Sequence, residues 1–311
     1  MTEHATVGID IAKDTFDVYI DPTRQLLHLD NTPEGHQQLL SSLSAITVKL
    51  VVMEATGRYH SLLAATLELA GLPVAVVNPR QVKNFARALG TLYKTDPNDA
   101  RIICEFGRRM EPEARPTPDE QTQRLAGMVT RRRQLVDNRT MEINRYKSCD
   151  DVVVSAGIKR HIDWLTAEIR DADDDIDKQI KVMPLWREKA TLLEEVKGIG
   201  PTTMAVLLAM LPELGRLNRH KISALVGVCP YAHDSGKMKG KRSIWGGRSA
   251  VRSALYMATL SAVRYNPTIR EFYERLTGRG KPFKVAVTAC VRKLLTILNA
   301  MLRDNKNWVT N

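Results

Sequence analysis

Residues 5–21 contain two stretches that alternate between apolar and polar side chains, a pattern typical of paired β-strands. The stretch VGIDI (7–11) has an apolar residue at every second position, and FDVYI (16–20) repeats the pattern after a short polar break. Because side chains alternate between the two faces of a strand, both stretches place their apolar residues on one face. The pattern predicts a β-hairpin, and RQLLHLDN (24–31) predicts a third strand beside it.

Strands and helices then take turns along the chain. PEGHQQLLSSLSAI (33–46) has the apolar spacing of a helix, and KLVVMEATG (49–57) is a short apolar strand that ends in a glycine turn. A helix, a buried strand and another helix follow, between residues 61 and 90. Strands followed by such alternation predict an α/β domain with a mixed sheet over residues 1–108.

The remaining chain divides after a proline-rich break, EPEARPTPDE (111–120). Residues 119–190 are polar and helical, with heptad-like apolar positions among many charges. We interpret residues 109–190 as a linker and coiled-coil helices, an arm or a dimerising element; two ordinary surface helices are the alternative. Residues 191–311 predict a mainly helical C-terminal domain.

Four acidic residues stand where the predicted elements begin or end. Asp10 lies inside the first strand, Glu54 ends an apolar strand, and Asp96 and Asp99 open a helix in KTDPNDAR. Strand interiors are poor in Asp, and a carboxylate leaving a buried strand is costly unless it is paired or metal-bound. Simpler roles are open: Asp96 and Asp99 suit a helix start, Asp10 suits a hairpin cap, and Glu54 suits an ion pair with Arg58.

Two acids on strands and two on a helix start are the components of an RNase H-like metal site. Phosphodiester transfer needs stabilisation of the attacking and the leaving oxygen, which two Mg²⁺ ions about 4 Å apart provide. Mg²⁺ prefers carboxylate oxygen, and four acids held together would repel one another without metal. The sequence therefore predicts magnesium, with two ions, between these four residues.

The charge of the chain is positive and uneven. The formal net charge is +11, and residues 197–311 carry 20 Lys and Arg against 5 Asp and Glu. A strongly basic C-terminal part favours a polyanionic partner, most often nucleic acid.

Two segments of this part are candidates for nucleic-acid contact. VKGIGPTT (196–203) has the pattern of a helix-hairpin-helix, in which backbone N–H groups bind a phosphate, although a plain bundle turn has the same glycines. DSGKMKGKRSIWGGRS (234–249) predicts an exposed loop next to an anion. The predicted nucleic-acid contacts are Lys197, Gly198, Gly200, Thr202, Lys237, Lys239, Lys241, Arg242 and Arg248.

Four aromatic residues can stack on bases, although such residues more often pack in a core or an interface. They are Tyr146, Trp164, Trp186 and Trp245, of which Trp245 is the best candidate.

Taken in order, these motifs resemble one family. GIDIAKDTFDV, VMEATG, VNP, KTDPNDAR, VKGIGPTTM, GVCP, DSG and RSALYMA look like the Piv-type DEDD transposases, insertion-sequence recombinases guided by a bridge RNA. The match covers most of the chain. It implies a RuvC-like N-terminal domain, a coiled-coil region and a C-terminal transposase domain.

The resemblance also implies a mechanism. Asp10, Glu54, Asp96 and Asp99 fall on the family's metal-binding acids, and Ser235 in DSG falls on its nucleophile. It implies strand cleavage through a covalent phosphoserine link, then exchange and rejoining. The partners that the resemblance implies are donor and target DNA, a non-coding bridge RNA and further copies of the chain, which would form a dimer or a tetramer.

The serine assignment depends on the Ser-Gly pair, because Ser243 and Ser249 lie in the same region. A serine hydroxyl needs activation. His233 is a possible base, but it also suits an ordinary loop position, and metal ions are the better activator.

Three other functions fit parts of the sequence. A RuvC-like nuclease would cleave branched DNA with water and two metals but no serine. An actin-like kinase fits GIDIAK, yet the chain shows no second Asp-Gly loop and no adenosine site. A non-catalytic nucleic-acid-binding protein needs none of the acids.

The sequence also indicates a compartment. We expect a bacterial or archaeal cytosol, close to the nucleoid, because no signal peptide, membrane-spanning run or CxxC pair is visible.

Overall fold

The chain forms two compact units, Met1–Thr117 and Pro118–Asn311. The computed structural model describes residues 4–57, 59–90, 96–114, 119–232, 234–236, 238, 240 and 242–308; the side chains of 96 and 97 are outside this description. The predicted proline-rich break spans the boundary between the units. The helices predicted as a separate middle part, 109–190, lie mostly in the second unit.

The first unit is built on five strands, and their bounds match the predicted alternation. They are β1 (Ala5–Ile11), β2 (Thr15–Asp21), β3 (Gln25–Asp30), β4 (Val48–Glu54) and β5 (Val74–Val77). The sheet order is β3-β2-β1-β4-β5. β1 is antiparallel to β2 and parallel to β4, and β4 is parallel to β5. The predicted mixed sheet is confirmed, and the first strand neighbours a later parallel one.

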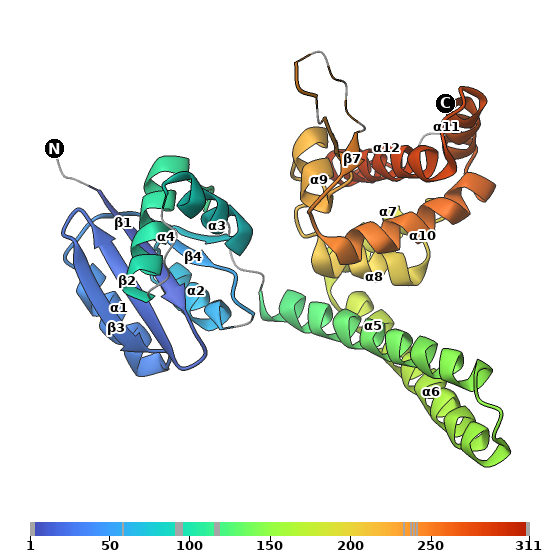
Figure 1. Cartoon of the computed structure of the whole chain (residues 1–311), viewed down its shortest axis with the longest axis horizontal. Helices are drawn as coiled ribbons and strands as arrows, with labels where there is room; N and C mark the ends of the chain where they lie inside the picture. Colours follow the sequence, from blue (N-terminus) through green and yellow to red (C-terminus); the bar gives the residue numbers. More distant parts are fainter. Residues whose placement is uncertain are drawn as a thin grey trace. The chain divides into compact units, whose positions relative to one another are not determined.

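Helices pack on both faces of this sheet (Figure 1). They are α1 (Pro33–Leu43), α2 (His60–Leu69), α3 (Pro79–Ala88) and α4 (Asp96–Met110). One apolar cluster joins Ile9 and Met53 of the sheet to Leu63 of α2. A second cluster joins Val52, on the other face, to Ile103 of α4. The sheet is therefore buried on both faces, as its parallel half requires.

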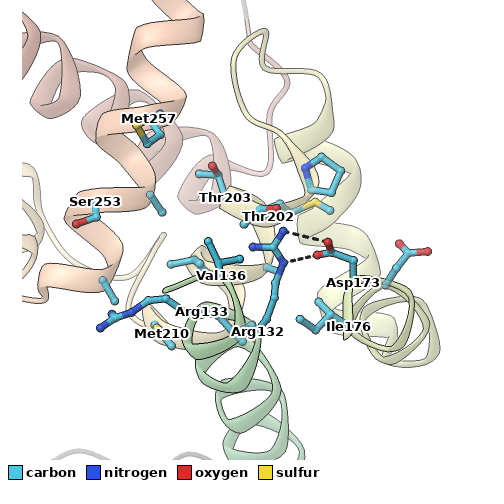
Figure 2. Close-up of a pocket in the computed structure, with 18 of the residues that line it drawn as sticks. Arg132, Arg133, Val136, Asp173, Ile176, Thr202, Thr203, Met210, Ser253 and Met257 are labelled. Atoms are coloured by element: carbon cyan, nitrogen blue, oxygen red, sulfur yellow. Dashed lines mark hydrogen bonds and ion pairs between the residues drawn. The ribbon is translucent and has the colours of Figure 1, made fainter. Parts of the chain in front are cut away.

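Two long helices open the second unit and form an antiparallel hairpin, α5 (Glu120–Lys147) and α6 (Val152–Val182). Gln121 bonds Gln179 near one end, and Arg132 forms an ion pair with Asp173 further along. The hairpin packs on α8, and Figure 2 shows the Arg132–Asp173 pair beside Thr202, at the edge of a mostly apolar cavity of about 810 Å³.

The rest of the second unit is mainly helical, as predicted. It contains α7 (Pro184–Glu194), α8 (Pro201–Met210), α9 (Arg219–Val226), α10 (Ser249–Tyr265), α11 (Pro267–Gly278) and α12 (Phe283–Asp304), with the short strands β6 (Pro230–Tyr231) and β7 (Ser243–Ile244). Among the described helices, α12 is the one long and apolar enough to span a membrane, and half of its most apolar stretch is buried in this unit's core.

Candidate functional site

Asp10 and Glu54 lie at the carboxyl ends of neighbouring parallel strands. Ile9 is opposite Met53 in the register of β1 and β4, so the next residues of the two strands, Asp10 and Glu54, share the opposite face. Ile9 and Met53 are fully buried in the core, whereas both acids are half-buried. The sheet register therefore brings together two acids that are 44 positions apart in sequence.

Helix α4 crosses the face that carries these acids, and two glycines permit its close approach. A side chain at Gly107 would come within 2.6 Å of Val52, and one at Gly8 would come within 2.3 Å of the backbone of Ala100 and Cys104. The Cys104 thiol donates to the Thr6 carbonyl at 3.1 Å. Because later residues of α4 contact earlier residues of β1, the helix runs antiparallel to the strand.

The first turn of α4 consequently lies toward the end of β1 that carries Asp10. Gly107 contacts Thr6, and Ala100 contacts Gly8, so Asp96 and Asp99 are next in the same direction. The side chain of Asp96 lies outside the described residues, and that of Asp99 is half-buried. Strand register and helix direction thus bring Asp10, Glu54 and the start of α4 to one end of one sheet face, and a site shared by all four acids stays a prediction.

Three of the four predicted acids have described side chains, which limits what the geometry shows about a metal site. Among the described residues, no three His, Cys, Asp or Glu side chains are close enough to hold an ion. The donor set nevertheless suits a hard divalent cation, since it consists of carboxylates at the ends of rigid elements. The placement of the strands and of α4 agrees with a shared pocket. The coordination of a metal ion by these acids stays a prediction.

A fifth acid on this face was missed by the sequence argument. Asp17 lies directly opposite Asp10 in the β1–β2 register, and its carboxylate is 2.9 Å from Nδ1 of His28. Like charges directly opposite each other destabilise a strand pair unless a cation lies near. The alternation in TFDVYID already places Asp17 on the polar face, and that signal was available in the sequence.

Asn31 holds the two acid-bearing strand ends together. Its Nδ2 donates to the Ala12 carbonyl at 3.1 Å, in the turn after β1, and lies 3.3 Å from the Tyr59 carbonyl, in the segment after β4. Its Oδ1 is 2.9 Å from Nε2 of the buried His36. Asn31 was not predicted, because nothing in its local sequence shows contacts 19 and 28 residues away.

Burial shifts the protonation of several groups in this unit. Desolvation lowers the pKa of His36 and that of His60, which opens α2 after the Glu54 turn. Burial raises the pKa of the Cys104 thiol to about 12, so this cysteine is a neutral packing residue between α4 and β1. The Cys104 thiol is therefore not a nucleophile at neutral pH.

The predicted nucleophile is carried by a narrow hairpin in the second unit. β6 and β7 pair antiparallel, and beyond them Ser235 exchanges two backbone hydrogen bonds with Met238, each 3.0 Å. Asp234 caps the ribbon by accepting from the Gly240 N–H at 3.0 Å. Gly236 has φ +54°, which the tight turn after Ser235 requires. Ser235 is exposed to solvent.

The base of this hairpin is tightly fixed. Gly227 ends α9 with φ +79°, and a side chain there would come within 2.2 Å of the Gly246 carbonyl. Arg252 donates to the carbonyls of Val226 and Gly246, which joins the two ends of the ribbon.

Arg248 forms an ion pair at this base, and its predicted phosphate contact stays a prediction. Its guanidinium forms a bidentate ion pair with Glu213, at 2.5 and 2.6 Å, and donates to the Met210 carbonyl at 2.9 Å. Bidentate pairs of this kind are strong and fix the guanidinium in one orientation. The other predicted cations divide: Arg242 is exposed, whereas Lys237, Lys239, Lys241 and the candidate base His233 lie outside the described residues.

The predicted helix-hairpin-helix turn connects α7 to α8. Gly198 has φ +108°, and a side chain there would meet Ala262 of α10 at 2.7 Å, so this glycine permits close packing. Lys197, Gly200 and Thr202 are exposed, and Gly200 faces open space. A phosphate contact through these three residues stays a prediction.

The aromatic candidates separate by burial. Trp186 is only 6% exposed and belongs to the core, which is the packing role that such residues more often have. Trp164 stacks on His161 with ring centroids 5.8 Å apart. Tyr146 and Trp245 are exposed, Trp245 at 64%.

Comparison with known proteins agrees with the sequence motifs. A family model described as transposase, of the IS110 DEDD type, matches residues 7–151, and one described as the transposase IS116/IS110/IS902 family matches residues 190–274. The structure of T. thermophilus RuvC in complex with a Holliday junction substrate is 16% identical, with a TM-score of 0.29, and covers 36% of this chain and 99% of its own.

Relatives align over nearly the whole chain. The pilin gene-inverting proteins of Moraxella bovis and Moraxella lacunata are each 30% identical over 316 residues, 96% of this chain and 96% of theirs. A 44.8 kDa protein of insertion element IS116 from Streptomyces clavuligerus is 23% identical over 96% of this chain and 95% of its own. The chain therefore belongs to the IS116/IS110/IS902 family of transposases, enzymes that recombine DNA.

Proposed function

We propose that this transposase cleaves and rejoins DNA strands through a covalent bond to Ser235, with divalent metal held by Asp10, Glu54, Asp96 and Asp99. The observation that carries the proposal is the convergence of strand ends and helix start on one face of the sheet. β1 and β4 supply one acid each at neighbouring ends, and α4 begins toward the same place. Magnesium, with two ions, is the cation that suits such a donor set.

The reaction can be written for the chain's own groups. The Oγ of Ser235 attacks the scissile phosphorus, one P–O bond to a sugar oxygen breaks, and the departing oxygen takes up a proton. The serine proton must leave at the same time. In the reverse step, a sugar hydroxyl from another strand attacks the phosphoserine, so the number of phosphodiester bonds is conserved and no external energy is required.

Metal, when bound, would stabilise the charge on the attacking and leaving oxygens. The protein's own contribution is position. Asp10 and Glu54 are fixed by sheet register, whereas Ser235 is presented on an exposed turn. A nucleophile exposed in this way can reach a phosphate bound by the acids of another copy, which is why we propose an oligomer, a dimer or a tetramer.

We further propose that target choice depends on a bridge RNA. The support is the resemblance of the ordered motifs together with the basic second unit, whose residues 197–311 carry 20 Lys and Arg against 5 Asp and Glu. Base pairing would then supply sequence specificity, and the protein would bind backbones. RNA that copurifies with the protein and derives from the DNA flanking its reading frame would support this part.

The serine step is tested by two matched variants. Ser235→Ala should abolish the covalent protein–DNA adduct and strand exchange, while Ser243→Ala, at the base of the same hairpin, should retain both. Unchanged cleavage by Ser235→Ala would instead indicate a RuvC-like nuclease that uses water. Loss of the adduct in Ser243→Ala alone would identify Ser243, in β7, as the nucleophile.

A further inference from the structure

A basic cavity of about 770 Å³ lies at the foot of the serine hairpin, within the second unit. β7, α9, α11 and α12 each contribute to its walls. We call it the basic groove, and its cationic and aromatic lining consists of Arg219, His220, Arg242, Lys284, Arg292, Lys293 and Phe272.

The positive charge of the basic groove is not compensated nearby. Its lining includes five Lys and Arg side chains and no Asp or Glu. Within the described part of the chain, no ion pair involves Lys284, Arg292 or Arg242, in contrast to Arg248 and its Glu213 partner. A hollow lined by one sign of charge concentrates the field and attracts an anion.

Helix α12 arranges polar groups along the groove at regular spacing. Lys284, Thr288 and Arg292 are each four residues apart, so they share one face of the helix. At 1.5 Å per residue the two cations are about 12 Å apart along the axis, enough for several phosphates of one strand. Lys293 is held in place by its ammonium, 4.7 Å from the centre of the Phe272 ring.

Apolar side chains form the rest of the wall, and they favour an unpaired strand over a duplex. Val285 is 53% exposed and Ile244 is 36% exposed, both facing the groove. A duplex presents only phosphates and sugars to a protein surface outside its grooves, whereas an unpaired strand also offers the faces of its bases. Single-strand binding sites combine a positively charged groove with ring faces on which bases stack, and Phe272 and His220 are the rings in this lining.

The groove is continuous with the element that carries the nucleophile. Ile244 belongs to β7 at the base of the hairpin that carries Ser235, and Arg242 directly precedes this strand. We propose that the basic groove binds an unpaired DNA strand next to the serine hairpin, through phosphate contacts to Lys284 and Arg292. This inference rests on the proposed function and adds the part of the DNA that the second unit holds.

The test is a binding measurement on the full chain carrying Ser235→Ala, so that no strand is cleaved. The probes are a fluorescein-labelled 24-nucleotide DNA, the duplex of the same sequence and the same sequence as RNA, titrated at several salt concentrations. The groove variant is Lys284→Gln with Arg292→Gln. The control is Arg279→Gln with Lys306→Gln, two exposed cations of the same unit that do not line the groove.

We expect the groove variant to bind unpaired DNA about tenfold more weakly or worse, with a salt slope smaller by about 1.4, or 0.7 for each lost phosphate contact. The control should change affinity by no more than about threefold, as distant screened charges do. Duplex DNA should lose less than unpaired DNA in the groove variant.

Three results would overturn the inference. Equal losses in the groove variant and the control would show that net charge alone matters. Equal losses for duplex and unpaired DNA would show that the groove does not prefer an unpaired strand. A loss confined to RNA would show that the groove binds RNA and not DNA. Strand exchange that persists in Ser235→Ala would contradict the proposed function but leave the groove result standing.

Discussion

The two halves of the proposed catalytic apparatus are built in opposite ways. Asp10 and Glu54 are at the ends of buried parallel strands, and Asn31 links the segments that follow them. Ser235 lies on an exposed ribbon, fixed at its base by Gly227 and Arg252. Groups that must hold a cation at fixed distances benefit from a rigid sheet, whereas a nucleophile that must reach a separate substrate benefits from projection. The contrast predicts that substitutions near the acids affect stability and chemistry together, and that substitutions at the ribbon tip affect chemistry alone.

The largest expected effect comes from the acids themselves. Asp10→Asn or Glu54→Gln should reduce strand cleavage by about 10³-fold or more, the value of several kcal/mol of transition-state stabilisation by metal. Asp14→Asn, an exposed acid in the turn after β1, should leave cleavage nearly unchanged. Equal loss in all three variants would contradict a specific metal site.

The next largest effect should be at the α7–α8 turn. In Gly198→Ala, the new Cβ would clash with Ala262, and the alanine would have to adopt a φ of +108°. We therefore expect a loss of about 2 kcal/mol or more in the free energy of unfolding. Gly200→Ala, with open space around it, should change stability by less than about 1 kcal/mol. Denaturant unfolding measures both. Weaker DNA binding by a stable Gly200→Ala protein would assign the turn a phosphate contact as well.

Asn31 sharpens the comparison on the acid side. Asn31→Ala removes hydrogen bonds to two segments, and we expect a loss of about 1–2 kcal/mol of stability, with cleavage slowed about tenfold because the acids are less well positioned. Asn78→Ala removes the cap of α3 in the same unit and should cost about 1 kcal/mol without slowing cleavage. If both variants slowed cleavage equally, general destabilisation would explain the effect of Asn31.

The smallest effect is on the pH dependence of stability. Burial holds the pKa of His36 in the folded chain below the ordinary value of 6.5. At a pH between the folded pKa and 6.5, the unfolded chain therefore binds a proton that the folded chain does not. The His36 contribution to stability is therefore present above pH 6.5 and declines as the pH falls below it. Unfolding measured from pH 7.5 to 5 should show a shallower decline for His36→Gln than for the parent. A steeper decline would indicate that His36 is protonated in the fold.

Much of the fold was predictable because its patterns are local. The alternation in VGIDI and FDVYI, and the apolar strand KLVVME, determine β1, β2 and β4 and hence the ends where Asp10 and Glu54 lie. The partners of Asn31 and the packing of Gly198 on Ala262 depend on residues far away in sequence, so no local pattern shows them. The ion pair of Arg248 was not predictable for the same reason, because its partner Glu213 lies 35 positions earlier in the sequence.

The most direct measurement joins the two regions in one experiment. DNA trapped on the protein during strand exchange can be digested with protease, and mass spectrometry then identifies the linked residue. We predict a single adduct on the peptide containing Ser235, formed only with a divalent cation and absent from Asp10→Asn. An adduct on Ser243 or Ser249, or strand exchange with no adduct at all, would contradict the account.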